Sequence, residues 1–242
     1  MKFAGKNVLV TGANRGIGLA TVRQLLQSGV GKVYAAARNP DSIPDLRDDR
    51  VVPVRLDITN ADDIAAATDA ASDLDVLINN AGVASFGSLL DAPLNDIERD
   101  MNVNYYATLN VIRAFAPILE ARGNATIVNV VTIAAFVNFP SLGGYSASKA
   151  ALFSLSQGLR MELAQRGITV HTVNPGPIDT DMAKDIELDK TSPEEAARNL
   201  VAGIESGEAD ILPDAAAENM FSVWKDDYRK LEQAVKEMHF SG

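Results

Sequence analysis

Short apolar runs alternate with longer stretches of helical period along the chain. Seven runs are rich in valine and isoleucine and apolar at consecutive positions, as in strands that are covered on both faces. They predict strands at 7–11, 32–36, 51–56, 75–79, 126–131, 169–173 and 210–212. The intervening stretches predict helices at 17–27, 61–70, 94–122, 145–166, 193–206 and 215–238. This alternation predicts one α/β domain over residues 1–242, a doubly wound parallel sheet of about seven strands with helices on both faces.

The composition fits a globular domain. The chain has 242 residues, of which 47% are apolar and 22% charged. The most apolar stretch, 125–139, is interrupted by Asn129, Thr132 and Asn138, so no segment is predicted to span a membrane. The formal charge of −10 disfavours nucleic acid and anionic membranes as partners, because an acidic surface repels phosphate groups.

Cysteine is absent, and the two histidines, His171 and His239, lie far apart in the sequence. We therefore expect neither disulfides nor a metal site. His171 is expected to pack inside its strand rather than react. Residues 1–6 run straight into the first strand and leave no room for a signal peptide, so we expect a cytoplasmic protein.

A glycine-rich loop follows the first predicted strand. Residues 11–18 read Thr-Gly-Ala-Asn-Arg-Gly-Ile-Gly and open a helix. Glycines allow a tight turn and let the backbone approach a pyrophosphate at the helix N-terminus, where free N–H groups favour anions. The loop therefore predicts a dinucleotide site, with an ordinary glycine-rich turn as the alternative.

Five further motifs follow later strands or lie on the helices between them. They are Asp57, Asn79-Asn80-Ala81-Gly82, Asn104, Tyr145-Ser146-Ala147-Ser148-Lys149 and Asn174-Pro175-Gly176. With Thr-Gly-x-x-x-Gly-x-Gly and this order of motifs, the chain resembles the short-chain dehydrogenase/reductase family from about residue 5 to about residue 180. The resemblance implies a Rossmann fold and hydride transfer between a nicotinamide cofactor and a substrate carbon.

The resemblance also implies a set of cofactor contacts beside Tyr145 and Lys149. They are Gly12, Asn14, Arg15, Gly16, Ile17, Gly18, Arg38, Asp57, Ile58, Asn79, Ala81, Gly82, Pro175, Gly176, Ile178 and Thr180. Asp57 is expected to accept a hydrogen bond from the adenine amine, or else to cap the turn that follows its strand. Asn79 and Gly82 are expected to support the sheet and the cofactor's sugar.

The second strand indicates which nicotinamide cofactor binds. In the family, NAD-binding members carry an acidic residue at the end of this strand, where it would repel a 2′-phosphate. Residues 33–38 here read Val-Tyr-Ala-Ala-Ala-Arg, so alanine takes the acidic position and Arg38 follows. Arg15 could reach the same phosphate, or be a solvated charge. We predict NADP(H), with Asp41 as the nearest feature that argues against it.

Tyr145 and Lys149 are four residues apart and share one helix face. A free tyrosine titrates near pH 10. A neighbouring ammonium and the positive nicotinamide ring are expected to lower the pKa of Tyr145, which makes the phenol a usable proton donor and acceptor. The resemblance implies that Tyr145 handles the substrate proton and that Lys149 also holds the nicotinamide ribose.

Two more residues complete the tetrad that the resemblance implies. The family's catalytic serine corresponds to Thr132, which keeps a hydroxyl and adds a methyl group that narrows the pocket. Ser141 is the fallback hydroxyl. Asn104 matches the family's helix asparagine, which anchors a water that links the lysine to solvent. Asn102 lies about 200° away around a helix and cannot face the same site.

The remaining segments concern substrate and assembly. Residues 181–191 are polar and poorly periodic, which predicts a substrate lid or an ordinary crossover. Residues 208–242, a predicted strand and one long helix, lack the usual ending of ketoacyl-carrier-protein reductases. The resemblance implies a homodimer through helices 94–122 and 145–166.

These observations predict an NADP(H)-dependent carbonyl reductase or alcohol dehydrogenase that acts on a ketone, aldehyde or secondary alcohol. The alternative is a non-catalytic NADP-binding sensor or interaction protein on the same fold. The intact pair of Tyr145 and Lys149 argues against that alternative.

Overall fold

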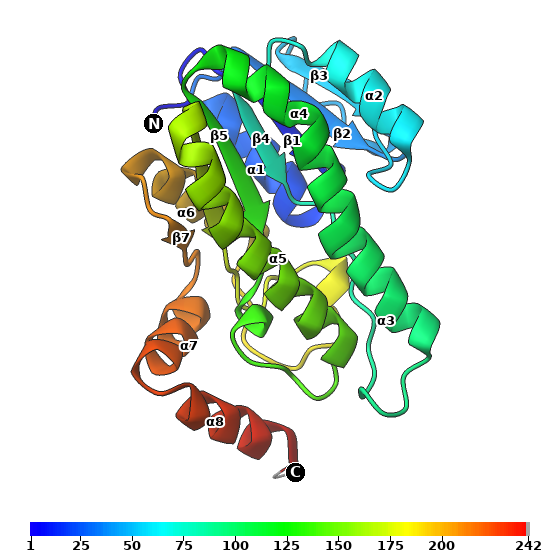
Figure 1. Ribbon diagram of the computed structural model, residues 1–242, viewed down its shortest axis with the longest axis vertical. Helices are drawn as coiled ribbons and strands as arrows, with labels where there is room; N and C mark the ends of the chain where they lie inside the picture. The colour runs from blue at the N-terminus through cyan, green and yellow to red at the C-terminus, as the bar shows by residue number, and fades with distance from the viewer. Residues whose placement is uncertain (241–242) are drawn as a thin grey trace.

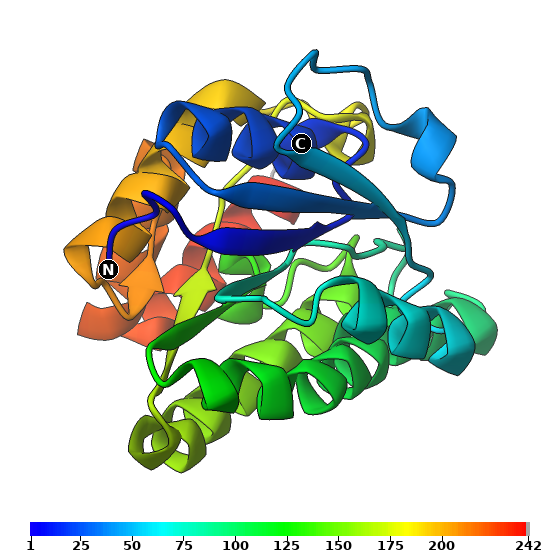
Figure 2. The same ribbon diagram turned by 90° about the horizontal axis from the view of Figure 1, so that it is seen from above.

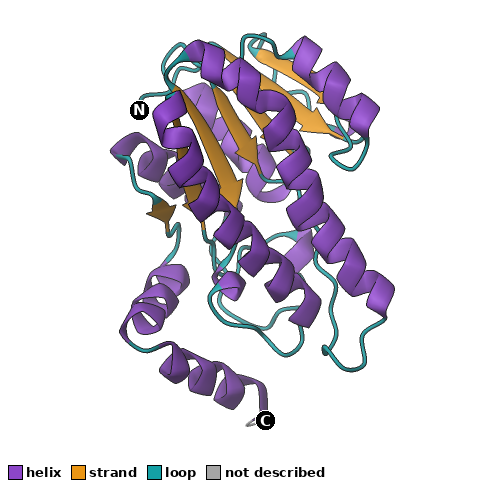
Figure 3. Cartoon of the chain, in the orientation of Figure 1, coloured by secondary structure: helices purple, strands orange, loops and turns teal. Residues whose placement is uncertain are grey.

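The computed structural model describes residues 1–240, and within them seven parallel strands form one sheet in the order β3-β2-β1-β4-β5-β6-β7 (Figure 3). The strands are β1 (Asn7–Thr11), β2 (Lys32–Ala37), β3 (Val51–Arg55), β4 (Val76–Asn79), β5 (Ala125–Val130), β6 (Ile168–Val173) and β7 (Asp210–Ile211). The predicted fold class and number of strands are confirmed. Each strand begins and ends within a residue or so of its expected bounds.

The helices connect these strands (Figure 1). They are α1 (Gly16–Gln27), α2 (Ala61–Ala70), α3 (Leu94–Met101), α4 (Thr108–Arg122), α5 (Gly143–Leu163), α6 (Pro193–Ser206), α7 (Ala215–Asp226) and α8 (Tyr228–Phe240). Several begin at capping side chains: Asn60 accepts from two N–H groups of α2, and Ser192 and Asp214 cap α6 and α7. Among residues 1–240, no helix is both long and apolar enough to cross a membrane.

The sheet lies between two helical layers (Figure 2). Helices α1 and α6 pack together on one face, and α2, α4 and α5 cover the other. Successive residues of β1 enter opposite layers: Val8 and Val10 pack with α1 and α6, whereas Leu9 packs with Phe115 of α4. Burial of both faces explains why the strands are apolar at consecutive positions.

Two of the predicted helices are wrong in their continuity. The stretch 94–122 contains a π-helical segment, Asn102–Ala107, between α3 and α4. The predicted helix 215–238 is broken at Asp227, whose backbone is extended and whose carboxylate accepts from the N–H of Arg229 at the start of α8. The C-terminal part is therefore a strand and two helices.

The chain reverses its direction of travel across the sheet between β1 and β4, which are neighbours. Loops that leave the carboxyl ends of these two strands diverge to opposite faces. Doubly wound sheets bind ligands in the resulting crevice. Helices α7 and α8 extend beyond the same carboxyl ends, next to the loop that follows β6 (Figure 1).

Candidate active site

A cavity of about 1080 Å³ lies at the carboxyl ends of the strands. Most of the residues expected to bind the cofactor or react line it. These are Gly12, Asn14, Arg15, Gly16, Ile17, Arg38, Asp57, Ile58, Ala81, Gly82, Thr132, Tyr145, Lys149, Pro175, Gly176, Ile178 and Thr180. The fold thus brings segments that are far apart in the sequence to one continuous site.

Three of the predicted residues, Gly18, Asn79 and Asn104, stand behind the cavity wall. The side chain of Asn79 lies inside the sheet, where its Nδ2 donates to Oδ1 of Asn129 at 2.9 Å. This hydrogen bond joins β4 to β5, in agreement with the expected support of the sheet, and Asn79 does not line the cavity. Asn80, the first residue after β4, lines the cavity instead.

The glycine-rich loop is held against the end of β4. Thr11 Oγ1 accepts from the N–H groups of Asn80 and Ala81, each at 3.0 Å, and Asn80 Nδ2 donates to the carbonyls of Thr11 and Gly12. Gly12 has a φ of +66°, in the left-handed region that favours glycine. A Cβ on Gly18 would stand 2.2 Å from the Gly12 carbonyl oxygen. This side of the cavity is therefore built from backbone.

The loop that follows β2 lines the end of the cavity that lies beyond the glycine-rich loop. Arg38 lines the cavity there, directly after the alanine that ends the strand. Asn14 Nδ2 donates to Ser42 Oγ at 3.2 Å, which ties the glycine-rich loop to the segment after Arg38. Arg15 forms an exposed ion pair with Asp181 at 2.7 Å. The end of the cavity next to β2 is therefore lined by two guanidinium groups, of Arg15 and Arg38, and by the neutral polar side chains of Asn14 and Ser42.

Asp57 follows β3 and caps the turn after its strand, which is one of the two roles expected of it. Its Oδ1 accepts from the N–H and the hydroxyl of Thr59, at 2.9 and 2.7 Å, so it caps the turn. These hydrogen bonds lower the pKa of Asp57, and the charges of Arg38 and Arg55 lower it further. The residue also lines the cavity.

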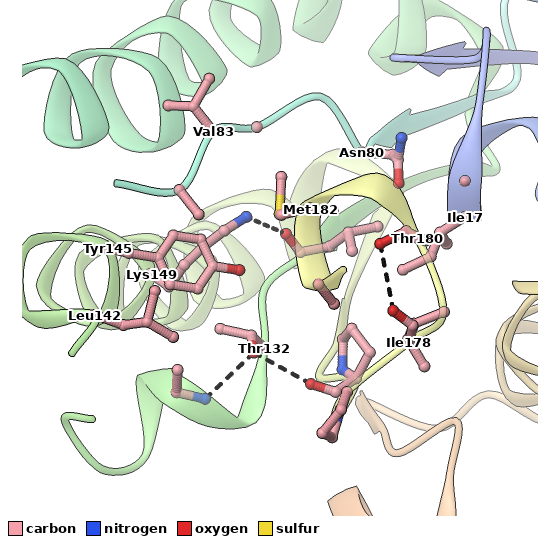
Figure 4. A pocket seen from close by; sticks show the side chains of 18 of the residues that line it. Ile17, Asn80, Val83, Thr132, Leu142, Tyr145, Lys149, Ile178, Thr180 and Met182 are labelled. Atoms are coloured by element: carbon pink, nitrogen blue, oxygen red, sulfur yellow. Dashed lines mark hydrogen bonds between the residues drawn. The ribbon is translucent and has the colours of Figure 1, made fainter. Parts of the chain in front are cut away.

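At the other end, Tyr145 and Lys149 project from α5 beside Thr132 (Figure 4). Lys149 Nζ donates to the Val130 carbonyl at 2.8 Å and lies 5.9 Å from the centre of the Tyr145 ring. Thr132 Oγ1 donates to the Pro175 carbonyl at 3.2 Å and accepts from the Ala134 N–H. The three side chains meet where β5, α5 and the loop after β6 converge.

Burial controls the ionisation of this group. It raises the pKa of Tyr145 to about 12, although the facing Thr132 hydroxyl lowers that pKa in part. It lowers the pKa of Lys149 to about 8, and the negative charge of Asp100 opposes this change. The chain's own groups thus shift the pKa of Tyr145 in the direction opposite to the expected one, because desolvation of the phenolate is the largest contribution. Tyr145 holds its proton at neutral pH.

Asn104 lies in the π-helical segment and is fully buried. Its Oδ1 accepts from the Val83 N–H, and its Nδ2 donates to the Val83 carbonyl and to Ser148 Oγ, at 2.9 Å each. A Cβ on Gly82 would stand 3.0 Å from Asn104 Oδ1 and 3.5 Å from Lys149 Nζ. Asn104 thus fixes the loop after β4 to α5, directly behind Lys149.

Two other features lie outside the set of predicted site residues. Asp100, one helical turn before Asn104, is fully buried and accepts from the N–H and the hydroxyl of Ser85. The cavity also has a wall that extends beyond the motifs, formed by Met182, Ile186, Leu188, Ala216, Asn219, Met220, Val235, Met238 and His239. Part of this wall comes from residues 181–191. The two ends of this segment are held together by a hydrogen bond from the Asp179 N–H to the Thr191 carbonyl.

Comparisons with known proteins agree with this site. The family model for short chain dehydrogenase matches residues 6–191. A short chain dehydrogenase from Burkholderia cenocepacia J2315, solved in complex with NADP, is 38% identical and has a TM-score of 0.93, covering 97% of this chain and 99% of that one. A Burkholderia phymatum short chain dehydrogenase/reductase in complex with NAD is 26% identical, with a TM-score of 0.82 over 95% of this chain and 96% of that one.

Among curated relatives, carbonyl reductase [NADPH] 2 of Sus scrofa is 34% identical over 203 residues, which cover 83% of this chain and 81% of that protein. The family model covers more than half of the chain, and its span contains the glycine-rich loop and the pair of Tyr145 and Lys149. The chain therefore belongs to the short-chain dehydrogenase/reductase family, whose members are oxidoreductases that transfer hydride with a nicotinamide cofactor.

Proposed function

We propose that the protein is an NADPH-dependent reductase of ketones or aldehydes, with Tyr145 as the proton donor. The observation that carries this proposal is the placement of the half-buried Tyr145 phenol beside the Thr132 hydroxyl and the Lys149 ammonium. The phenol lies at the end of a cavity that continues to the glycine-rich loop. The reverse reaction would oxidise a secondary or primary alcohol.

The residues present fit a dinucleotide. Gly12 and Gly16 have positive φ angles, and the loop between them exposes backbone N–H groups at the start of α1. Such N–H groups bind a pyrophosphate. Lys149, at the opposite end, would hold the ribose of the nicotinamide. When bound, the reduced nicotinamide supplies a hydride to the carbonyl carbon.

Preference for NADP(H) is supported by the end of β2. The strand ends in alanine, and Arg38 follows it into the cavity. A guanidinium forms strong charge-assisted hydrogen bonds with a phosphate, whereas no carboxylate stands at the strand end to accept from a ribose hydroxyl. Asp41 lies in the neighbouring turn and lines a separate, smaller pocket. The NADP held by the Burkholderia cenocepacia relative agrees with this proposal.

The chain's own groups handle the proton. The Tyr145 hydroxyl donates its proton to the carbonyl oxygen as the carbon accepts the hydride, which gives the alcohol and leaves a phenolate. The Thr132 hydroxyl orients the same oxygen. The ammonium of Lys149 stabilises the phenolate until a solvent proton replaces the one donated.

NADPH oxidation with a panel of ketones and aldehydes tests the proposal. We expect turnover with NADPH, weaker turnover with NADH, and a loss of about 10²- to 10⁴-fold in kcat for Tyr145→Phe. The Kd for NADPH should change little in this variant. Tight NADPH binding without turnover of any carbonyl compound would favour the sensor, which is the alternative function.

We also propose the homodimer expected from the sequence, which forms through residues 94–122, the stretch that contains α3 and α4, and through residues 145–166 of α5 and the turn after it. Light scattering of the purified protein measures its mass directly. A mass of one chain, 25.8 kDa, would exclude this assembly.

A further inference from the structure

The cavity has two ends that lie toward opposite edges of the sheet. Arg38 and Asp57 follow β2 and β3 at one edge, and α7 and α8 follow β7 at the other. Helices α7 and α8 share an apolar cluster with the segment 131–137, which carries Thr132. Their cavity-lining residues therefore belong to the end at which the substrate carbonyl would react.

Apolar side chains from separate segments line this reactive end. Leu142 lies beside Tyr145, and Met182 lies across from it (Figure 4). Met220 of α7 and Met238 of α8 also line the cavity. Three of the chain's six methionines are in this wall. Methionine is unbranched and polarisable, so such a wall adapts to apolar groups of different shapes.

The wall remains partly open to water. Four large apolar residues line the cavity and are nevertheless exposed: Phe86 is 50% exposed, Met182 45%, Leu188 43% and Met238 59%. Their exposure is unfavourable unless an apolar ligand covers them, because contiguous exposed apolar surface is characteristic of binding sites.

The charges nearby disfavour an anionic substrate. Lys149 is the ammonium that the proposed mechanism uses, and the other cation that lines this side is Arg99. Its guanidinium donates to the Ser85 hydroxyl at 2.9 Å and lies 3.9 Å from the carboxylate of Asp96. Asp189 stands at the cavity, and the chain as a whole has a charge of −10. His239 is packed edge-on against Phe240 at the end of α8.

We infer that the substrate is an uncharged carbonyl compound with a bulky alkyl or aryl group, which lies against Met182, Leu188, Met220 and Met238. This inference rests on the proposed reductase function and makes α8 a specificity element. Each methylene that the wall buries contributes about 0.8 kcal/mol, which corresponds to about a fourfold gain in kcat/KM.

A series of 2-butanone, 2-hexanone and 2-octanone tests the inference. For the wild type, we expect kcat/KM with NADPH to rise with chain length, by up to about fourfold per methylene. Met238→Glu places a carboxylate in the wall. It should lower the ratio of kcat/KM for 2-octanone to kcat/KM for 2-butanone by about tenfold or more. Met238→Ala should lower the ratio less. Gln233→Glu, which adds the same charge to α8 outside the cavity wall, should leave it unchanged.

Binding of 2-octanol, followed by the fluorescence of the single tryptophan, Trp224 on α7, provides a readout that does not require turnover. Met238→Glu should weaken this binding and Gln233→Glu should not. The inference would be overturned if kcat/KM did not rise with the chain length of the ketone, or if both Met238 variants had the same kcat/KM ratio of 2-octanone to 2-butanone as the wild type. If no ketone is reduced but 2-octanol binding still depends on Met238, the apolar site stands and the reductase function fails.

Discussion

The two ends of the cavity lie in one fold but are made of different groups. At the dinucleotide end, loops that follow β1 to β4 present backbone N–H groups, glycines and a few polar side chains. At the substrate end, methionine and leucine side chains come from residues 181–191, α7 and α8, and Phe86 and Phe139 come from the loops after β4 and β5. The first end is fixed by hydrogen bonds within the sheet's own loops, and the second by packing between elements that are distant in the sequence.

This difference separates what all members of a fold family need from what one member selects. A pyrophosphate and a ribose are constant ligands, so short loops of set spacing suffice to bind them. A substrate's apolar group varies, and side chains on appended helices can change without disturbing the sheet. Substitutions at the two ends should therefore alter different kinetic quantities.

After Tyr145→Phe, the largest effect is expected at Thr132, where the two ends meet. Its Oγ1 holds the loop after β6 and faces the phenol of Tyr145. Thr132→Ala should lower kcat about 10²- to 10³-fold, as does the loss of a donor that stabilises the developing charge. Thr132→Ser, which restores the hydroxyl, should retain turnover. Equal rates in the alanine and wild-type enzymes would remove Thr132 from the mechanism.

A single methyl group should disrupt the dinucleotide end alone. In Gly18→Ala, the new Cβ would meet the Gly12 carbonyl at 2.2 Å, so backbone must move. Such overpacking costs about 1–3 kcal/mol, and we expect NADPH to bind roughly 10- to 100-fold more weakly. Gly158→Ala in α5 is the matched control, since nothing lies within 4 Å of its Cβ position. Calorimetric titration with NADPH measures both; unchanged affinity in Gly18→Ala would contradict this account of the loop.

A smaller change is expected for Arg38. Loss of a charge-assisted hydrogen bond to a phosphate costs about 1.5–3 kcal/mol, and Arg15 and Ser42 remain nearby. Arg38→Ala should lower the ratio of kcat/KM for NADPH to that for NADH by about tenfold or more. The ratio of kcat/KM between long and short ketones should not change, because Arg38 lies at the dinucleotide end of the cavity. A shared loss with both cofactors would show that Arg38 supports the loop rather than the 2′-phosphate.

The same division explains how much the sequence could predict. The strands, the glycine-rich loop and the pair of Tyr145 and Lys149 depend on local periodicity or on spacing within one element, and the structure brings them together as expected. Asn79 and Asn80 are adjacent, so the spacing of the motif could not show which of the two lines the cavity. In the structure Asn79 pairs with Asn129 in the register of β4 and β5, whereas Asn80 has already left the strand.

Tertiary contacts decided what the sequence could not. The π-helical segment that places Asn104 behind Lys149 is invisible to a simple helical period. At the break, the Asp227 carboxylate accepts from the Arg229 N–H, and the helix that follows, α8, contributes Val235 and Met238 to the cavity wall. The high pKa of Tyr145 follows from burial, which no spacing of residues reports.

The smallest effect is expected at Asp100, which does not line the cavity but influences the pKa of Lys149 at the reactive end. Its negative charge opposes the lowering of the Lys149 pKa, which stands at about 8. As pH rises through that value the ammonium is lost, so activity should fall on the alkaline side. Asp100→Asn removes the charge while an amide oxygen can still accept from Ser85. The Lys149 pKa then falls further, and the alkaline limb should move to lower pH.

The pH profile of kcat for ketone reduction distinguishes this electrostatic role from a structural one. Ser85→Ala removes a hydrogen bond that Asp100 accepts but keeps the carboxylate. It should therefore reduce stability without moving the limb. If both variants lose activity equally at every pH, Asp100 only anchors the loop after β4. A limb that moves to higher pH in Asp100→Asn would contradict the sign of the interaction, since removal of an anion disfavours a neighbouring cation.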